Sequence, residues 1–326
     1  MAISIQTTYG RDGLRPIDIV RDGPQIVDLL RLVFGETLDS PESVLAGAGN
    51  PINDFLFRFA PSASRLSSGV VWQQDGRIVG NATLLTTRSW DRYLVANVAV
   101  HPSFRRSGIA RALMNAITAD VKNRGGRVIL LQVVKENDPA IRLYESLAYY
   151  PIGNMTTWFA TAGRVRQIEL DYSPDLDVDI ELLPKRRWQE AYTLDAGRVH
   201  PDLNWPEPLR PDAYRQTLWQ GAVQFMNGQQ RESWVSYGHR DELAGLVHIA
   251  SEWGRSHLVS LRVDAQHAGR LERPLLAKAI RRLRYLPRRN VRMDHPEDDE
   301  ATSRLLREAN FSAQRTLTHM RLDLSQ

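Results

Sequence analysis

The sequence predicts an α/β fold in which mixed sheets are flanked by helices. One apolar run ends at His101-Pro102, and a Gly-containing turn and a helical pattern follow it. A second apolar run begins after Gly125-Gly126. This strand–turn–helix–strand order is typical of a βαβ unit, whose two strands are parallel. An Asp-Gly pair upstream indicates an antiparallel hairpin, and the length of 326 residues favours two domains.

The N-terminal part of the chain is expected to contribute one strand and one helix. Residues 14–20 alternate enough between apolar and polar side chains to form the strand. Asp22 is a suitable N-cap for a helix that extends to about Phe34. The apolar residues of this helix share one face: Ile26, Leu29, Leu30 and Val33.

Asp75-Gly76 is the turn of the predicted hairpin, because this pair favours tight turns. The strands on its two sides are residues 70–74 and 77–87. The hairpin is expected to pair antiparallel with the core strand at 94–100.

A basic turn from Arg105 to Ala110 connects the core strand to a helix expected over 111–124. The first N–H groups of a helix have no partner within it, and the helix dipole adds partial positive charge there. Gly108 allows a ligand to approach the backbone closely. The turn therefore predicts a site for a phosphate or pyrophosphate. An ordinary helix start with solvated arginines is the alternative.

A second motif follows the apolar strand expected at 128–134. Asn137, Pro139 and Ala140 precede the stretch LYESLAYY at 143–150. Together with the turn, this order resembles the GNAT superfamily of acetyl-CoA-dependent N-acyltransferases. The family pattern is V-x-V at a strand end, R/Q-x-x-G-x-G/A in the turn, then an Asn and A-x-x-x-Y-E-x-x-G-F. The matching residues are Val98, Val100, Arg105, Gly108, Ala110, Asn137, Ala140, Tyr144 and Glu145.

Two residues depart from the family pattern. Ala148 stands where the family usually has Gly, and Tyr149 stands where it has Phe. Both replacements keep the side chain apolar and of similar size, so the match is retained. The chain from about residue 14 to 160 fits the same fold.

The resemblance implies a binding site for acetyl-CoA as co-substrate. The pantetheine arm would pair with the backbone of Val98, Ala99 and Val100, and an N–H of this strand would polarise the thioester carbonyl. Asn137 would hydrogen-bond the same arm beside Ala140. The residues expected around the pyrophosphate are Arg105, Arg106, Ser107, Gly108, Ile109, Ala110 and Arg111.

Tyr144 is the expected catalytic acid, which would protonate the departing thiolate as the resemblance implies. The alternative is a core tyrosine whose hydroxyl reaches water or the backbone. Asn137 can likewise cap the helix that follows it, and this role is compatible with ligand binding.

The general base has no clear candidate in the sequence. Many family members carry an acidic residue on the core strand, where this chain has Ala96 and Asn97. His101 is titratable, but a structural role in the turn before Pro102 is the expected one. The carboxylates in or beside the expected acceptor region are Glu36, Asp39, Glu42, Asp54 and Glu136.

Two strands are expected after the motif, at 154–161 and 165–170, and the acidic, Pro-containing stretch 171–178 is interpreted as a linker. The expected domains are therefore 1–172, with the acyltransferase site, and 173–326.

The second domain is interpreted as a degenerate copy of the first. Gly245 takes the place of Gly80 in the expected hairpin of the second domain, and placing Val263 opposite Val100 sets an offset of 163 residues for the segment that follows. Chance alignment of two amphipathic patterns is the alternative. Further on, Arg304 and Leu305 fall opposite Arg142 and Leu143 at an offset of 162, so a single deletion links the two alignments. The copy lacks the motif residues, because Ala268, Leu271, Arg273, Asp299 and Leu306 stand opposite Arg105, Gly108, Ala110, Asn137 and Tyr144. A leucine side chain at the turn is expected to obstruct a pyrophosphate, so this domain would serve a structural role or complete a substrate pocket.

Composition limits the remaining possibilities. The absence of cysteine excludes an acyl-cysteine intermediate and thiolate metal sites, and no other metal site is indicated. The net charge of +4 is mild and its basic residues are scattered, so no nucleic-acid partner is inferred. No apolar run is long enough for a membrane span, and no signal pattern is present, so a cytoplasmic location is expected.

The expected activity is transfer of an acetyl group from acetyl-CoA to a primary amine, by direct attack in a ternary complex. The alternative is a non-catalytic acyl-CoA-binding or regulatory protein. The acceptor, a small molecule or a peptide, is not specified, because the loops 35–68 and 200–231 would determine it. A homodimer is possible, because four tryptophans of the second half can serve packing or an interface: Trp188, Trp205, Trp219 and Trp234.

Overall fold

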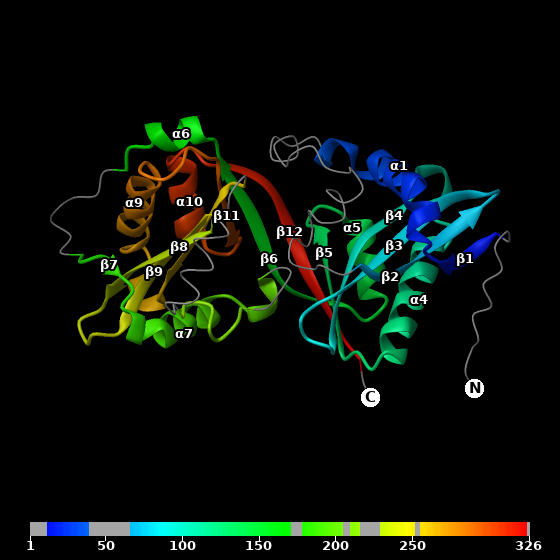
Figure 1. The fold of residues 1–326 in the computed structure, drawn as a ribbon, viewed down its shortest axis with the longest axis horizontal. Helices are drawn as coiled ribbons and strands as arrows, with labels where there is room; N and C mark the ends of the chain where they lie inside the picture. The colour runs from blue at the N-terminus through cyan, green and yellow to red at the C-terminus, as the bar shows by residue number, and fades with distance from the viewer. Residues whose placement is uncertain are drawn as a thin grey trace. The chain divides into compact units, whose positions relative to one another are not determined.

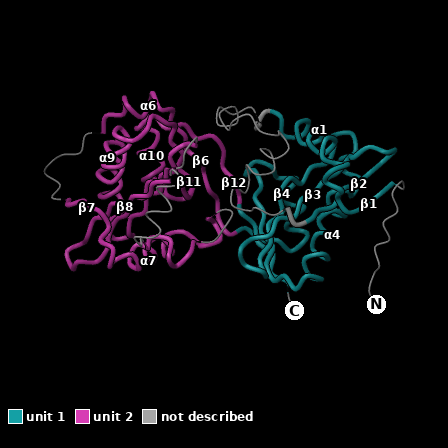
Figure 2. The backbone as a smooth tube through the Cα atoms, viewed as in Figure 1, with its two compact units in different colours: residues 1–151, 205–207, 319–326 teal, residues 152–204, 208–318 magenta. Residues whose placement is uncertain are grey.

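The structure is a computed structural model, and the residues that it describes are 12–38, 66–170, 178–204, 209–215, 229–251 and 255–324. The chain forms two compact units (Figure 2). Unit 1 comprises residues 1–151, 205–207 and 319–326, and unit 2 comprises 152–204 and 208–318. The expected α/β class is confirmed, because each unit contains a mixed sheet flanked by helices (Figure 1).

The sheet of unit 1 has the strand order β1-β2-β3-β4-β5-β12. Its first four strands pair antiparallel, whereas β4 and β5 pair in parallel as the βαβ pattern predicted. The last part of β12 belongs to this unit, where Leu324 donates to the carbonyl of Arg127 at 2.8 Å. The strands are β1 (Gly13–Pro16), β2 (Leu66–Gln74), β3 (Arg77–Thr86), β4 (Arg92–Val100), β5 (Val128–Val134) and β12 (Ser312–Asp323).

Helices cover both faces of this sheet. Helix α4 (Ile109–Asn123) packs on one face, where Leu113 and Ile117 are fully buried. Helix α1 (Ile19–Leu38) packs on the other face, in a separate apolar cluster with Ile78 and Ala99. The short helices η1 (Pro102–Phe104) and α5 (Asp138–Glu145) follow β4 and β5. This arrangement places the predicted turn and the Tyr144 motif in one unit.

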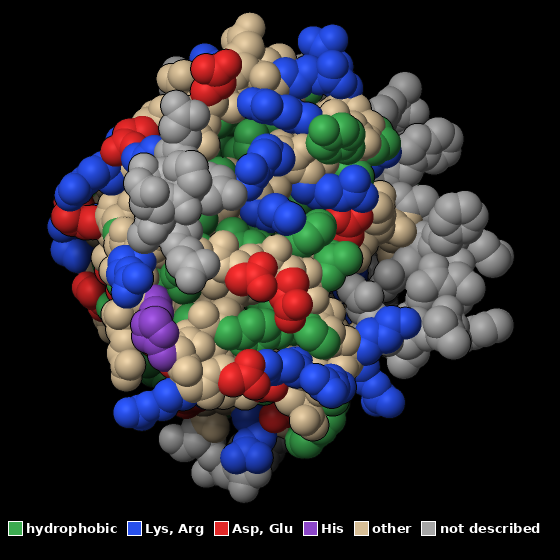
Figure 3. Space-filling view, turned by 90° about the vertical axis from the view of Figure 1, so that its left-hand side faces the viewer, with side chains coloured by type: hydrophobic (Ala, Val, Ile, Leu, Met, Phe, Trp, Pro, Cys, Tyr) green, Lys and Arg blue, Asp and Glu red, His purple; other side chains and the backbone are tan. Residues whose placement is uncertain are grey.

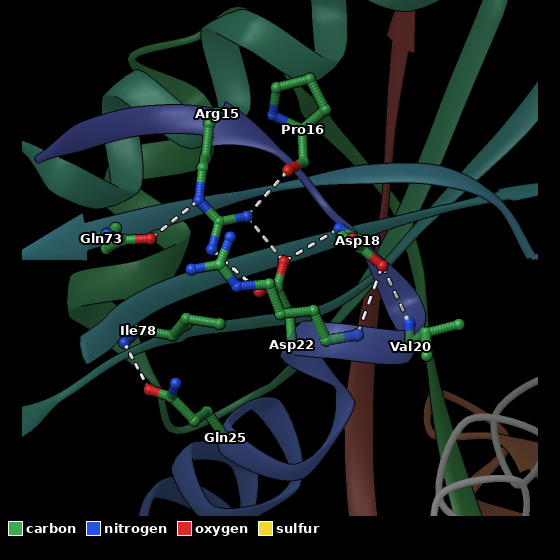
Figure 4. A network of polar contacts seen from close by, with 9 residues as sticks. Arg15, Pro16, Asp18, Val20, Asp22, Gln25, Gln73 and Ile78 are labelled. Carbon is green, nitrogen blue, oxygen red and sulfur yellow. Dashed lines mark hydrogen bonds and ion pairs between the residues drawn. The ribbon is translucent and has the colours of Figure 1, made fainter. Parts of the chain in front are cut away.

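The start of α1 is fixed by an ion pair that the sequence did not predict (Figure 4). Arg15 of β1 donates to both carboxylate oxygens of Asp22, at 2.6 and 2.8 Å. Asp18, not Asp22, caps the helix, because its side chain accepts from the amides of Val20 and Arg21. The expectation of a cap at Asp22 was therefore wrong, and Asp22 is instead buried in the first turn.

Unit 2 has the strand order β12-β6-β11-β10-β9-β8-β7, and β10 and β11 are its parallel pair. Residues 162–167 form helix α6, so the strand expected at 165–170 was wrong. Its strands are β6 (Tyr150–Ala160), β7 (Glu181–Leu182), β8 (Gln230–Tyr237), β9 (Leu243–Ser251), β10 (His257–Val263) and β11 (Val291–Pro296). Its helices are α6 (Ala162–Gln167), η2 (Lys185–Arg187), α7 (Trp188–Arg198), η3 (Pro201–Leu203), η4 (Ala265–His267), α9 (Glu272–Leu283) and α10 (Glu300–Glu308).

The two units repeat the same local geometry at the predicted offset. Gly80 pairs with Val100 in unit 1, and Gly245 pairs with Val263 in unit 2. A 3-10 turn follows each core strand, and the next helix begins 163 residues later in the second unit, at Ile109 and Glu272. The tandem arrangement is therefore confirmed. Residues 152–170 belong to unit 2, and the last residues of the chain belong to unit 1. The boundary expected from the sequence was at residue 172.

Charge is mixed on the surface. Figure 3 shows one face, on which Lys and Arg side chains are interspersed with acidic and hydrophobic ones. Within the described parts of the chain, no helix is long and apolar enough to cross a membrane.

Candidate functional site

The candidate site lies where β4 and β5 stop pairing. Their parallel register runs from Arg92 opposite Val128 to Val95 opposite Leu131, and no further pair follows. On its other edge β4 stays paired with β3 as far as Val100. The backbone of 96–100, which includes the expected residues Val98, Ala99 and Val100, therefore has one edge without a strand partner. An unpaired edge of this kind can accept an extended ligand as an added strand.

A β-bulge interrupts β4 at this point. Asn97 and Val98 together lie opposite Ala82 of β3, because the register shifts between Asn81 and Thr83. Asn97 has a φ of 56°, in the left-handed region that Asn tolerates better than most residues. The bulge thus begins two residues past the last β4–β5 pair.

The basic turn has the open geometry that the sequence predicted. Gly108 is the N-cap of α4 with a φ of 82°, and a side chain there would meet no atom within 4 Å. No described residue accepts a backbone hydrogen bond from the amides of residues 106–111. Ile109 anchors the helix, since its Cγ2 would lie 2.7 Å from a Cβ at Gly80. Gly80 therefore permits the close approach of α4 to β3 that positions these free amides.

The arginines of the turn remain available to an anion. The Arg105 Nε donates to the Val100 carbonyl at 3.3 Å, and Arg111 donates to the Ser146 hydroxyl at 2.8 Å. Arg106 adopts a positive φ of 67°. Arg105, Arg106 and Arg111 are all exposed, and no carboxylate in the described part of the chain pairs with them. Ser107 lies in the same turn and donates to the Phe104 carbonyl at 2.5 Å.

Asn137 is the N-cap of α5, and its side chain accepts from the amide of Ala140 at 3.3 Å. The capping alternative is therefore confirmed. Asn137 is exposed and Ala140 is half-buried beside the apolar cluster under α4. The predicted contact of Asn137 with a pantetheine arm stays a prediction.

Tyr144 is buried in the core of unit 1, with 6% of its surface exposed. Burial raises the pKa of Tyr144 well above 10.0, so the hydroxyl is protonated at neutral pH. Its ring lies 6.0 Å from that of Tyr149. Tyr149 is also buried, and its hydroxyl has no hydrogen-bond partner. The site thus contains Tyr144, which keeps its proton at neutral pH, and Tyr149, which stands where the family pattern has Phe.

The end of α5 explains the other departure from the family pattern. Tyr149 donates to the Tyr144 carbonyl, and Ala148 donates to the Glu145 carbonyl, which is the Schellman arrangement. Ala148 has a φ of 65°. The family's Gly fits this position because glycine adopts a positive φ without steric cost.

The acidic candidates for a general base gain no support. Asp39, Glu42 and Asp54 lie outside the described residues, as does the side chain of Glu36. Glu136 is exposed in the turn before α5. The structural role expected for His101 is confirmed, because its Nδ1 accepts from the amide of Ser103 at 3.2 Å.

In unit 2 the equivalent turn is filled by the side chains of two of its own residues, Leu271 and Glu272. Leu271 does not project from the turn as expected; it is buried, and its Cδ1 would lie 3.2 Å from a Cβ at Gly245. The side chain of Glu272 instead closes the turn before the helix, since its Oε1 accepts from the Gly269 amide at 2.9 Å. Glu272 is 5% exposed, so a carboxylate is held where unit 1 leaves amides free.

The remaining counterparts in unit 2 are structural. Asp299 caps α10 as Asn137 caps α5, and it also bonds to His295 at 2.9 Å. Leu306, which aligns with Tyr144 of unit 1, is fully buried. Within the described residues, no group of acidic, His or Cys side chains is arranged to hold a metal ion. A surface hollow of about 380 Å³ lies in unit 2, apart from all of these positions, and is lined by Arg164, Gln167, Arg307, Asn310 and Phe311.

Comparison with known proteins agrees with this geometry. Residues 39–149 match the model of the Acetyltransferase (GNAT) family. The ribosomal protein bS18-alanine N-acetyltransferase of Escherichia coli (strain K12) is 34% identical over 76 residues, which are 23% of this chain and 50% of that protein. The enzyme of the same description from Salmonella typhimurium is 33% identical over 72 residues, or 22% of this chain and 49% of that protein. The chain thus spans about half the length of the curated relatives it matches.

Two solved structures resemble nearly the whole chain. A tandem GNAT protein from the clavulanic acid biosynthesis pathway has a TM-score of 0.54 at 18% identity, and the matched region covers 96% of this chain and 99% of that protein's chain. A GCN5-related N-acetyltransferase from Sphaerobacter thermophilus has a TM-score of 0.60 at 16% identity and covers 95% of each chain. At these identities the likeness concerns the fold, which is a tandem of two such domains.

Proposed function

We propose that this chain, which belongs to the acetyltransferase (GNAT) family through residues 39–149, transfers an acetyl group from acetyl-CoA to a primary amine. The observation that carries the proposal is the unpaired edge of β4 beside a turn with free amides. These two features lie in one unit and are joined by one short turn, η1. They suit a ligand that combines an extended arm with a pyrophosphate.

Acetyl-CoA would bind with its pantetheine arm along residues 96–100. Its pyrophosphate would face the amides of residues 106–111 and the exposed arginines of the turn. The open space at Gly108 supports this position, because a bulky group can approach the backbone there without a side chain in the way. Asn137 would reach the arm from the N-terminus of α5.

Tyr144 would donate a proton to the CoA thiolate when the amine displaces it. The raised pKa of Tyr144 keeps its proton in place at neutral pH. When Tyr144 gives this proton to the thiolate, the negative charge moves from sulfur to the phenolate, and the proton that the attacking amine loses would restore the neutral tyrosine. The amine would attack the thioester directly, because the sequence has no cysteine to carry the acetyl group. The non-catalytic alternative would assign Tyr144 to core packing alone.

The acceptor class is taken from the relatives. The matching E. coli protein is named for acetylation of an alanine of ribosomal protein bS18. A peptide with an N-terminal alanine is therefore the first acceptor to test, followed by small amines. We further propose that residues 1–172 carry the activity, that 173–326 support it without binding acetyl-CoA, and that the protein works in the cytoplasm, where acetyl-CoA is supplied.

Calorimetric titration of acetyl-CoA tests the proposal. The wild-type chain is expected to bind, and Gly108→Glu is expected to abolish binding, because a carboxylate would enter the pyrophosphate site. Gly125→Glu is the matched control. Gly125 lies at the other end of α4, has a φ of 76° and also has nothing within 4 Å of an added Cβ. Absence of binding to the wild-type protein, or equal loss in both variants, would contradict the proposal.

A further inference from the structure

Two asparagines meet at the bulge of β4, and their contact is partly buried. Asn81 of β3 is fully buried, and its Nδ2 donates to the backbone carbonyl of Asn97 at 2.7 Å. The same Nδ2 lies 3.3 Å from the Thr83 hydroxyl. The shorter of the two contacts therefore holds the backbone carbonyl of a residue in the bulge.

Each asparagine leaves one buried amide atom without a partner. Asn81 Oδ1 accepts no hydrogen bond, and Asn97 Nδ2 donates none. Buried polar atoms are nearly always hydrogen-bonded, so an unmet acceptor and an unmet donor at one bulge need an explanation. An acceptor and a donor together match the hydrogen-bonding needs of a water molecule.

The second unit shows that the fold does not require this arrangement. Strand β10 pairs with β9 in unbroken register from Leu258 to Val263, so no bulge is present. The residue next to Gly245, in the position of Asn81, is Leu246, which is fully buried. Unit 2 also has the turn that Glu272 closes by its bond to the Gly269 amide. The bulge and its asparagine therefore occur in the unit with the open turn, and the straight strand occurs in the unit with the closed turn.

We infer that Asn81 and Asn97 are positioning residues for acyl transfer: Asn81 holds the β4 bulge, and the two unmatched amide atoms hold an ordered water beside the unpaired strand edge. The inference rests on the proposed function. The clamp fixes the backbone along which the thioester would lie. The water occupies a polar site on the core strand where this chain has no carboxylate.

Substitutions separate the parts of this arrangement. Asn81→Leu installs the residue of unit 2 and removes both the clamp and the acceptor. Asn97→Gly keeps the left-handed backbone and removes only the donor. Thr83→Val is the matched control, because it removes a neighbouring polar group and leaves the bond to Asn97 in place.

Two measurements are made on the full chain. Hydrogen–deuterium exchange of residues 94–100 reports on the bulge, with residues 257–263 of unit 2 as the internal reference. Acetyl transfer to a peptide with an N-terminal alanine gives kcat and KM. Asn81→Leu is expected to speed exchange in 94–100 alone and to lower kcat by about 100-fold with acetyl-CoA affinity within about threefold. Asn97→Gly is expected to lower kcat with exchange near that of the wild type.

The outcomes are distinguishable. Unchanged exchange in Asn81→Leu, or unchanged kcat in both asparagine variants, would overturn the inference while acetyl transfer by the wild type still stands. A parallel loss in Thr83→Val would assign the effect to general destabilisation and would also overturn it. If the wild type binds acetyl-CoA and acetylates no amine, the proposed function fails. Exchange without acetyl-CoA then still decides the clamp, since residues 94–100 should exchange faster in Asn81→Leu than in the wild type whether or not an amine is acetylated.

Discussion

The amide of Tyr149 donates to the carbonyl of Tyr144 at 3.0 Å, and this bond closes α5 around a residue with a positive φ, Ala148. A non-glycine residue in the left-handed region costs about 1–2 kcal/mol. Ala148→Gly is therefore expected to raise the free energy of unfolding by about 0.5–1 kcal/mol, after the entropy that glycine adds to the unfolded chain. Urea unfolding measures this.

The control for Ala148→Gly is the same substitution inside a regular helix. Ala116 is half-buried in the middle of α4. Ala116→Gly should lower the free energy of unfolding by about 1 kcal/mol, because glycine is a poor helix former. Two changes of the same sign would contradict the assignment of strain to Ala148.

The ion pair between Arg15 and Asp22 should stabilise unit 1 in a pH-dependent way. Burial alone would raise the pKa of Asp22, but the bonds from Arg15 and from the Asp18 amide together outweigh it and lower the pKa. A lowered pKa contributes stability that is present above the unfolded value of about 3.9 and is lost as pH falls through the folded value. Asp22→Asn should therefore cost about 3 kcal/mol at pH 7 and progressively less below pH 4.

Denaturant unfolding from pH 7 down to pH 3 tests this difference. Asp28→Asn serves as the control, because the side chain of Asp28 is 78% exposed and lies 4.0 Å from Arg31. Exposed pairs contribute about 0–1 kcal/mol. A gap between the Asp22 variant and the wild type that stays constant with pH would show that the carboxylate charge is not the stabilising group.

Tyr144→Phe is expected to lower kcat by about 100-fold or more, because the thiolate then leaves without a proton donor. Acetyl-CoA affinity should change little. Since the pKa of Tyr144 is raised, Tyr144 should keep its proton, and loss of that proton should not lower the rate up to pH 10. Steady-state kinetics over this range is the measurement.

Tyr149→Phe is the matched control for Tyr144→Phe. The Tyr149 hydroxyl is buried without a hydrogen bond, so its removal should leave stability within about 1 kcal/mol of the wild type or raise it. The rate should be retained as well. Equal losses of kcat in both variants would count against a specific acid role for Tyr144.

Unit 2 is expected to bind no acetyl-CoA, which gives one site per chain in calorimetry. The buried carboxylate of Glu272 would repel a pyrophosphate at the start of α9, and it also accepts the hydrogen bond from the Gly269 amide. Glu272→Ala should lower the free energy of unfolding by about 1 kcal/mol, because this hydrogen bond in the turn is lost. Two sites in the wild type would overturn the interpretation of unit 2.

Local sequence patterns predicted the central elements well. The strand at 128–134 has the bounds that apolar patterning gave it, and the helix after the turn begins two residues earlier than expected. These elements carry strong periodicity and clear Gly or Pro boundaries. The strand expected at 165–170 has neither, and residues 165–167 instead form the end of helix α6, where Thr161 supplies the N-cap.

The sequence by itself determined the βαβ unit, the open turn at Gly108, the order of the Tyr144 motif and the duplication, because each depends on residues that are near in the chain or repeat at one offset. Tertiary structure alone decided the rest. The bond from Asn81 to Asn97, the bulge, the pair Arg15–Asp22 and the carboxylate of Glu272 depend on register and burial. Register follows from how whole strands pair, so no local pattern of side chains specifies which polar atoms meet.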